Sequence, residues 1–119
     1  MMNISLYTSD SAVKAFDKKV GVIANNVANI QSEDFKKSRA IIQEDMSNQG
    51  VQVNISKVNT PGPQVSEYND GKIMDIELSN VEIAEETTQS IAAERGYQAN
   101  LKMITTADDM LGTSIDIIR

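Results

Sequence analysis

Two pairs of adjacent carboxylates, Glu85/Glu86 and Asp108/Asp109, are the residues most able to do chemistry in this sequence. Acid–base catalysis needs two carboxylates that converge across a cleft. Neighbouring residues on a helix point about 100° apart, so neither pair converges. Negative charge at a helix start explains Glu85 and Glu86 without catalysis. We therefore expect that the protein is not an enzyme and has no catalytic residues.

Two of the residue types most used in catalysis and metal binding, cysteine and histidine, are missing from the sequence. Its 119 residues include no Cys and no His, which excludes disulfides, thiolate or imidazole catalysis and zinc sites built on those ligands. We expect no cofactor and no metal. A formal charge of −6 argues against nucleic acid as a partner. No apolar run approaches the roughly 20 residues of a membrane span, and the start has no Sec signal pattern, so we expect neither membrane insertion nor a cleaved Sec signal.

A cluster of amides is the most unusual local feature. Asn25, Asn26 and Asn29 fall at the end of a helical pattern, in the stretch "ANNVANIQSEDFKKSR". Asparagine disfavours helix interiors and bonds readily to nearby backbone. The cluster therefore predicts a helix end that fixes the exit of the chain into "FKKSR"; a plain helix end with solvated amides is the alternative. The cations of "FKKSR" fit either an exposed strand edge or a contact with an acidic neighbour.

The element before the cluster is an amphipathic helix, predicted over about 10–31, with Ser9, Asp10 or Ser11 as N-cap. Its apolar residues recur at spacings of three and four, as in a coiled-coil seam. This N-terminal seam contains Val13, Phe16, Val20, Ile23 and Val27.

The middle of the chain, 35–78, reads as a short β segment. "RAII" and the alternating Val51, Val53 and Ile55 predict a hairpin around a turn at 47–50, in which Gly50 can take positive φ. "TPGP" at 60–63 is a break, "YNDG" at 68–71 is a second turn, and a short third strand can follow it.

The last part of the chain predicts one long helix over about 80–118, starting in a capping box of Ser79 and Glu82. Its apolar stripe changes phase near Gly96, which predicts a bend or a change of partner there. The C-terminal seam contains Tyr97, Leu101, Ile104, Leu111, Ile115 and Ile118.

These elements predict a mainly α fold with a small antiparallel β insert, in a single domain over 1–119. The long N- and C-terminal helices should pair as a coiled coil, with the N-terminal seam on Leu101 to Ile118. The longer C-terminal helix leaves an unpaired surplus, which indicates a homo-oligomer formed through helices.

Two stretches resemble the bacterial flagellar basal-body rod and hook axial proteins. "ANNVANIQSEDFKKSR" resembles the N-terminal signature of that family, and "SNVEIAEETTQSIAAERGYQANLKMITTADDMLGTSIDIIR" resembles its C-terminal segment. The short middle is most similar to the small proximal-rod type. Departures include Asp34 where the family usually has Gly, Ser32 for Thr, and Gly96 where Ala is common.

The resemblance implies a structural rod subunit located in the flagellar basal body. Such proteins leave the cell through the flagellar type III export apparatus without a cleaved Sec signal, and their terminal helices pack with other rod and hook subunits. The Asn amides could then bond to neighbouring subunits. Two other functions stay open: a cytoplasmic helical chaperone or adaptor for flagellar export, and a wall-cleaving enzyme, which would need convergent carboxylates.

Overall fold

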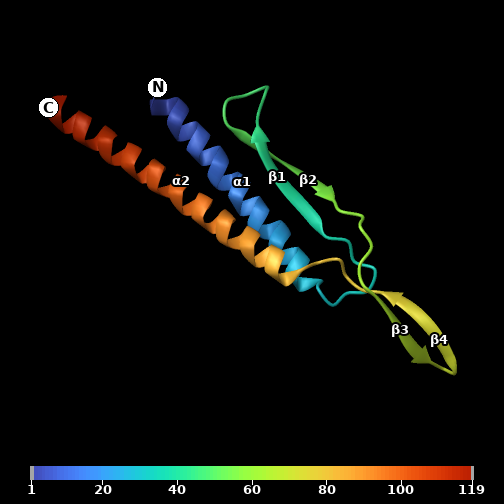
Figure 1. Ribbon diagram of the computed structural model, residues 1–119. Helices are drawn as coiled ribbons and strands as arrows, with labels where there is room; N and C mark the ends of the chain where they lie inside the picture. The colour runs from blue at the N-terminus through green and yellow to red at the C-terminus, as the bar shows by residue number, and fades with distance from the viewer. Residues whose placement is uncertain (1, 119) are drawn as a thin grey trace.

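Two long helices and two β-hairpins make up an elongated molecule (Figure 1). The computed structural model describes residues 2–118 and measures 84 × 26 × 17 Å. Helix α1 (Met2–Ala28) runs antiparallel to α2 (Ile83–Ile118), and the two lie side by side. The prediction of two long terminal helices around a small antiparallel β insert is therefore confirmed.

Helix α1 starts well before the predicted residue 10 and ends at Ala28. The predicted N-cap residues Ser9, Asp10 and Ser11 lie inside the helix, so that prediction was wrong. Ser11 has another use: its Oγ donates to the Thr8 carbonyl oxygen at 2.8 Å and accepts from the Val51 amide at 3.2 Å. A serine that accepts a hydrogen bond from a distant strand cannot be distinguished by sequence from one that caps its own helix.

The first hairpin pairs β1 (Ser38–Glu44) with β2 (Val51–Lys57), as predicted. It packs along α1 on the side away from α2, as Figure 1 shows. Gly50 has φ 114°, and a Cβ there would press on the Ser11 side chain. The turn therefore needs glycine for both conformation and space.

The second hairpin pairs β3 (Gln64–Asn69) with β4 (Lys72–Glu77) through a two-residue turn at Asp70 and Gly71. Both turn residues have positive φ, as a tight hairpin turn requires. Only the β4 strand was expected, because β3 has too few apolar residues to form a clear alternating pattern. Among the described residues this hairpin packs against no other helix or strand, and it projects from one end of the molecule (Figure 1).

Helix α2 begins at Ile83, so the predicted capping box of Ser79 and Glu82 was wrong. Ser79, Asn80 and Val81 form a buried, non-helical segment, in which the Ser79 Oγ accepts from the Val81 amide at 3.3 Å. Gly96 lies inside one uninterrupted helix. The buried apolar residues are mostly small, with Ala15 on α1 and Ala93 on α2 almost fully enclosed. Alanine lets neighbouring elements approach closely but buries little apolar surface.

Candidate assembly site

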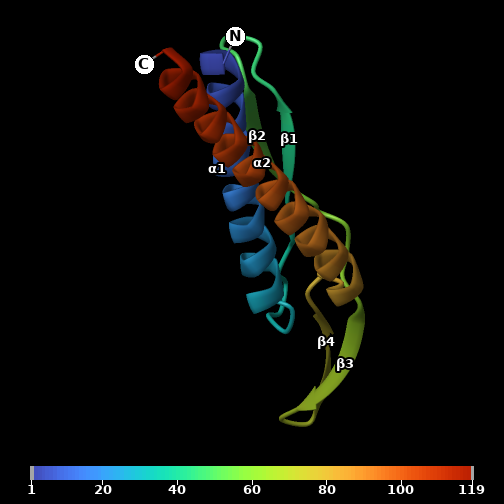
Figure 2. The same cartoon turned by 90° about the vertical axis from the view of Figure 1, so that its left-hand side faces the viewer.

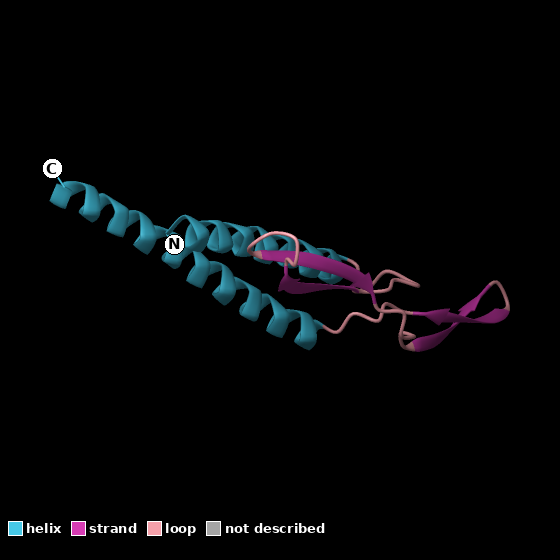
Figure 3. Cartoon of the chain, turned by 90° about the horizontal axis from the view of Figure 1, so that it is seen from above, coloured by secondary structure: helices cyan, strands magenta, loops and turns pink. Residues whose placement is uncertain are grey.

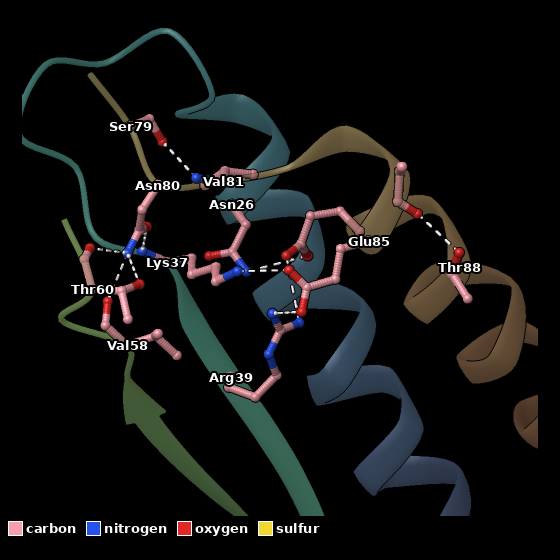
Figure 4. A network of polar contacts seen from close by, with 12 residues as sticks. Asn26, Lys37, Arg39, Val58, Thr60, Ser79, Asn80, Val81, Glu85 and Thr88 are labelled. Carbon is pink, nitrogen blue, oxygen red and sulfur yellow. Dashed lines mark hydrogen bonds and ion pairs between the residues drawn. The ribbon is translucent and has the colours of Figure 1, made fainter. Parts of the chain in front are cut away.

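Asn26 is the centre of the most enclosed part of the molecule, with no exposed surface. Its Oδ1 accepts from the Ser38 amide at 3.0 Å, and its Nδ2 donates to the Ser38 carbonyl oxygen at 2.8 Å. The same Nδ2 donates to the Glu86 carboxylate at 3.3 Å. One amide thus holds the end of α1, the start of β1 and the start of α2 together (Figure 4).

The acidic pair at the start of α2 completes this cluster. The Arg39 guanidinium lies 2.6 Å from the Glu85 carboxylate and 3.5 Å from that of fully buried Glu86, and the Lys37 ammonium lies 2.6 Å from Glu85 (Figure 4). We call Asn26, Lys37, Arg39, Glu85 and Glu86 the polar knot. The Lys37 hydrogen bond and the nearby Arg39 hold the pKa of Glu85 below its ordinary value.

The polar knot corrects two interpretations of the sequence. The Glu85 and Glu86 carboxylates bind side chains from other parts of the fold. They therefore do more than supply favourable charge at a helix start. The cations of "FKKSR" bind acids of their own chain, because Lys36 also pairs with Glu77. Neither a free strand edge nor a neighbouring molecule is needed to explain them.

Asn80 is a second structural amide, which the sequence reasoning missed. Its Oδ1 accepts from the Lys37 amide at 2.6 Å, and its Nδ2 donates to the carbonyl oxygens of Val58 and Thr60 at 2.8 and 2.9 Å (Figure 4). The side chain therefore ties three loops into one crossing point. As sequence, "SNV" is interpreted as part of a helix cap and of the family's C-terminal segment, and neither interpretation gives Asn80 a role.

The other two amides of the cluster act locally. Asn29 Nδ2 donates to the Asn25 carbonyl oxygen at 2.9 Å, and Asn29 Oδ1 accepts from the Ser32 hydroxyl at 3.0 Å. Asn25 itself is exposed. This geometry agrees with a helix end that directs the following chain, whereas fully buried Asn26 has no free face for a neighbouring subunit.

Asp34 explains the glycine that the family usually has at its position. Its φ is 56°, in the left-handed region that favours glycine, and its amide donates to the Glu77 carbonyl oxygen at 2.9 Å. Asp tolerates this conformation better than most residues. Asp34 therefore holds a backbone conformation that glycine adopts readily.

The N-terminal seam faces α2, but opposite different residues from those predicted. Phe16 packs over Gly96, where an added Cβ would overlap its ring. Val20, Ile23 and Val27 border the space facing Ile83 to Ile91 of α2. Val13 is half-buried on the same helix. The predicted pairing of this seam with Leu111, Ile115 and Ile118 was wrong, because the seam residues from Phe16 to Val27 lie opposite residues 83–96 of α2.

The C-terminal seam therefore divides into two parts. Tyr97 lies next to Phe16's partner Gly96 and borders a hollow with Val20. Beyond it come Leu101, 40 % exposed, and half-buried Ile104 and Leu111. Phe16 lies 14 positions after Met2 and faces Gly96, and Met110 lies 14 positions after Gly96. Because the helices are antiparallel, Met2 is level with Met110. Residues 111–118, which we call the overhang, consequently extend past α1, as Figure 3 shows.

The helices α1 and α2 diverge toward the end of α1 and the start of α2 (Figure 2), and an open apolar groove lies between them there. The groove has a volume of about 510 Å³. Val20 and Val27 from α1 and Ile83 and Ile91 from α2 line it, and each is 37–55 % exposed. Glu86 of the polar knot lies at its base. Val20, Ile23 and Val27 of the N-terminal seam thus border an open hydrophobic recess, together with α2 residues that were not predicted for assembly.

Over residues 2–118, no group of three or more acidic side chains is arranged to hold a metal ion. Within the same range, no helix is long and apolar enough to cross a membrane.

Comparison with known proteins matches both ends of the chain. Residues 6–36 match the family model "Flagella basal body rod protein", and residues 76–117 match "Flagellar basal body rod FlgEFG protein C-terminal". The flagellar basal-body rod protein FlgC of Salmonella typhimurium is 26 % identical over 116 residues, covering 85 % of this chain and 86 % of that protein.

Larger relatives match over a shorter part of the chain. The flagellar basal-body rod protein FlgG of Bacillus subtilis is 43 % identical over 44 residues, which are 37 % of this chain and 17 % of FlgG. The flagellar hook protein FlgE of Borreliella burgdorferi is 50 % identical over 36 residues, 30 % of this chain and 8 % of FlgE. The chain thus spans less than a fifth of the length of these relatives. With family segments matched on both sides of its β insert, the chain belongs to the flagellar basal-body rod and hook protein family.

Proposed function

We propose that this chain is a non-catalytic structural subunit of the bacterial flagellar basal-body rod, of the proximal-rod type. Its terminal helices assemble by coiled-coil packing with other copies and with other rod and hook subunits. It reaches the rod through the flagellar export apparatus without a cleaved Sec signal. The near full-length alignment with the rod protein FlgC supports the proximal-rod type.

One observation carries this proposal: the two helices pair with each other and still leave apolar surface uncovered. Ile115 in the overhang is 53 % exposed and Ile118 is 85 % exposed. Fully burying one such side chain stabilises an assembly by about 1.5–3 kcal/mol. An apolar stripe of this kind on a small protein marks an interaction site.

A charge placed on this stripe tests the assembly role. Leu111→Asp should abolish incorporation into the rod and so abolish motility, because a carboxylate cannot be buried unpaired in an apolar contact. Thr113→Asp is the matched control, since it adds the same charge two residues away on the opposite side of the helix. Normal rods and motility with Leu111→Asp, or equal loss with both variants, would refute the proposal.

A further inference from the structure

The groove and the overhang are two uncovered apolar features of the helical body, and they lie at opposite ends of it. The groove lies between the end of α1 and the start of α2, whereas the overhang is the far end of α2 (Figures 1 and 2). Both belong to the same α1–α2 interface. The groove is where that interface widens, and the overhang is where its α2 side continues without α1.

The two features match in length. The groove is lined by residues 20–28 of α1 and residues 83–91 of α2, a span of about 12 Å at the helical rise of 1.5 Å per residue. The overhang, residues 111–118, spans about the same length by that rise. Leu111, Ile115 and Ile118 follow spacings of four and three, which place them along one side of the helix.

We propose that the groove receives the overhang of a second copy of this chain. This inference rests on the proposed function and names the contact through which copies add to one another. Leu111, Ile115 and Ile118 of one copy cover Val20, Val27, Ile83 and Ile91 of the next. In the groove, the overhang of the second copy packs against α2, as α1 does along the rest of α2.

The occupant cannot be the chain's own overhang. Twenty residues of continuous helix, about 30 Å by the helical rise, separate Ile91 from Leu111. A second copy displaced along the long axis reaches the groove with its α2 parallel to the first. The C-terminal end of one α2 then approaches the N-terminal start of another, which is the favourable order of helix dipoles.

The geometry also determines the kind of assembly. Donor and acceptor surfaces differ, so the contact is heterologous and leaves a free groove at one end and a free overhang at the other. Such contacts extend into an open series of copies, whereas a two-fold contact would stop at a dimer.

Engineered cysteines test the contact directly, because the chain has no cysteine of its own. The full chain carrying Val27→Cys and Ile115→Cys is purified, oxidised and examined on non-reducing gels. We expect a ladder of dimers, trimers and larger species.

The matched control combines Val27→Cys with Ile117→Cys, since Ile117 is 78 % exposed and points away from the apolar side of the overhang. The control should give several-fold less product. A second pair, Ile83→Cys with Leu111→Cys, tests the same contact if the first variant fails to fold.

Each outcome is informative. A ladder that forms only with the two cysteine pairs that join the groove to the overhang supports the inference. No ladder from either pair, equal ladders from the control, or dimers alone would overturn it. Incorporation of the reduced variants into basal bodies is measured in parallel. If they incorporate but form no ladder, the groove contact fails and the rod function stands; if they form ladders but the unaltered chain is absent from basal bodies, the rod function fails.

Discussion

The side-chain amide of Asn26 exchanges two hydrogen bonds with the backbone of Ser38, as one strand residue does with its partner in an antiparallel ladder. It thereby replaces the missing edge partner at the start of β1 and anchors β1 to α1. The Glu86 carboxylate accepts from the same amide and extends the link to α2. The end of α1, the start of β1 and the start of α2 are therefore held together by one side chain.

Asn26→Asp should lower the free energy of unfolding by about 3 kcal/mol, because it removes a buried donor and adds a second carboxylate beside Glu86. Asn25→Asp makes the same chemical change on an exposed residue of the same helix end and should cost less than about 0.5 kcal/mol. Urea unfolding followed by circular dichroism measures both. Equal losses would show that Asn26 has no special role.

Asp34→Gly should stabilise the protein by up to about 1 kcal/mol, because glycine adopts φ 56° without steric cost. Part of this gain is lost to the greater entropy of glycine in the unfolded chain. Glu33→Gly, at the exposed neighbouring position, should be neutral or destabilising. Thermal unfolding compares the two variants, and a lower melting temperature for Asp34→Gly would contradict the explanation of the family glycine.

Gly96→Ala should destabilise the protein by about 1–3 kcal/mol, because its Cβ would overlap the Phe16 ring and push the helices apart. The better helix propensity of alanine offsets only about 1 kcal/mol of this. Gly112→Ala, where an added Cβ meets no atom within 4 Å, should be neutral or stabilising. If both substitutions stabilise equally, then Phe16 does not pack on Gly96 in solution.

Acid should weaken the polar knot. The pKa of Glu85 is lowered in the folded protein, chiefly by the Lys37 hydrogen bond and then by the nearby charges of Arg39 and Lys37. Its stabilising contribution is therefore complete above the ordinary value of 4.5 and disappears as the pH falls through the lowered pKa. Glu85→Gln should flatten the pH dependence of stability below 4.5, and Glu33→Gln should not. Parallel curves for unaltered and Glu85→Gln protein would contradict this assignment.

The sequence predicted the local elements well, since they follow from periodicity and turn chemistry. The two helices, the first hairpin and the positive φ of Gly50 could all be inferred from patterns within a few residues. What failed depended on distant partners. Ser11 resembles a cap but holds Val51, and Glu86 resembles a helix-start charge but is buried against Asn26.

The register between the helices was the main error, and its cause is physical. The strongest apolar spacing lies at Leu101 to Ile118, so pairing by pattern selected that part of α2. The structure instead places the N-terminal seam opposite residues 83–96 of α2, because the polar knot fixes the end of α1 beside Glu85 and Glu86. Asn80, whose partners come from the Lys37, Val58 and Thr60 backbone, gave no periodic signal.

Quantitative mass spectrometry of hook–basal bodies, purified from the bacterium that encodes the chain, shows whether the chain is a rod subunit. We expect the chain to be present at several copies per particle and to remain after stringent washing. Its absence from the particles, together with recovery of the protein from the cytoplasm, would contradict the rod function and favour a role as an export chaperone or adaptor.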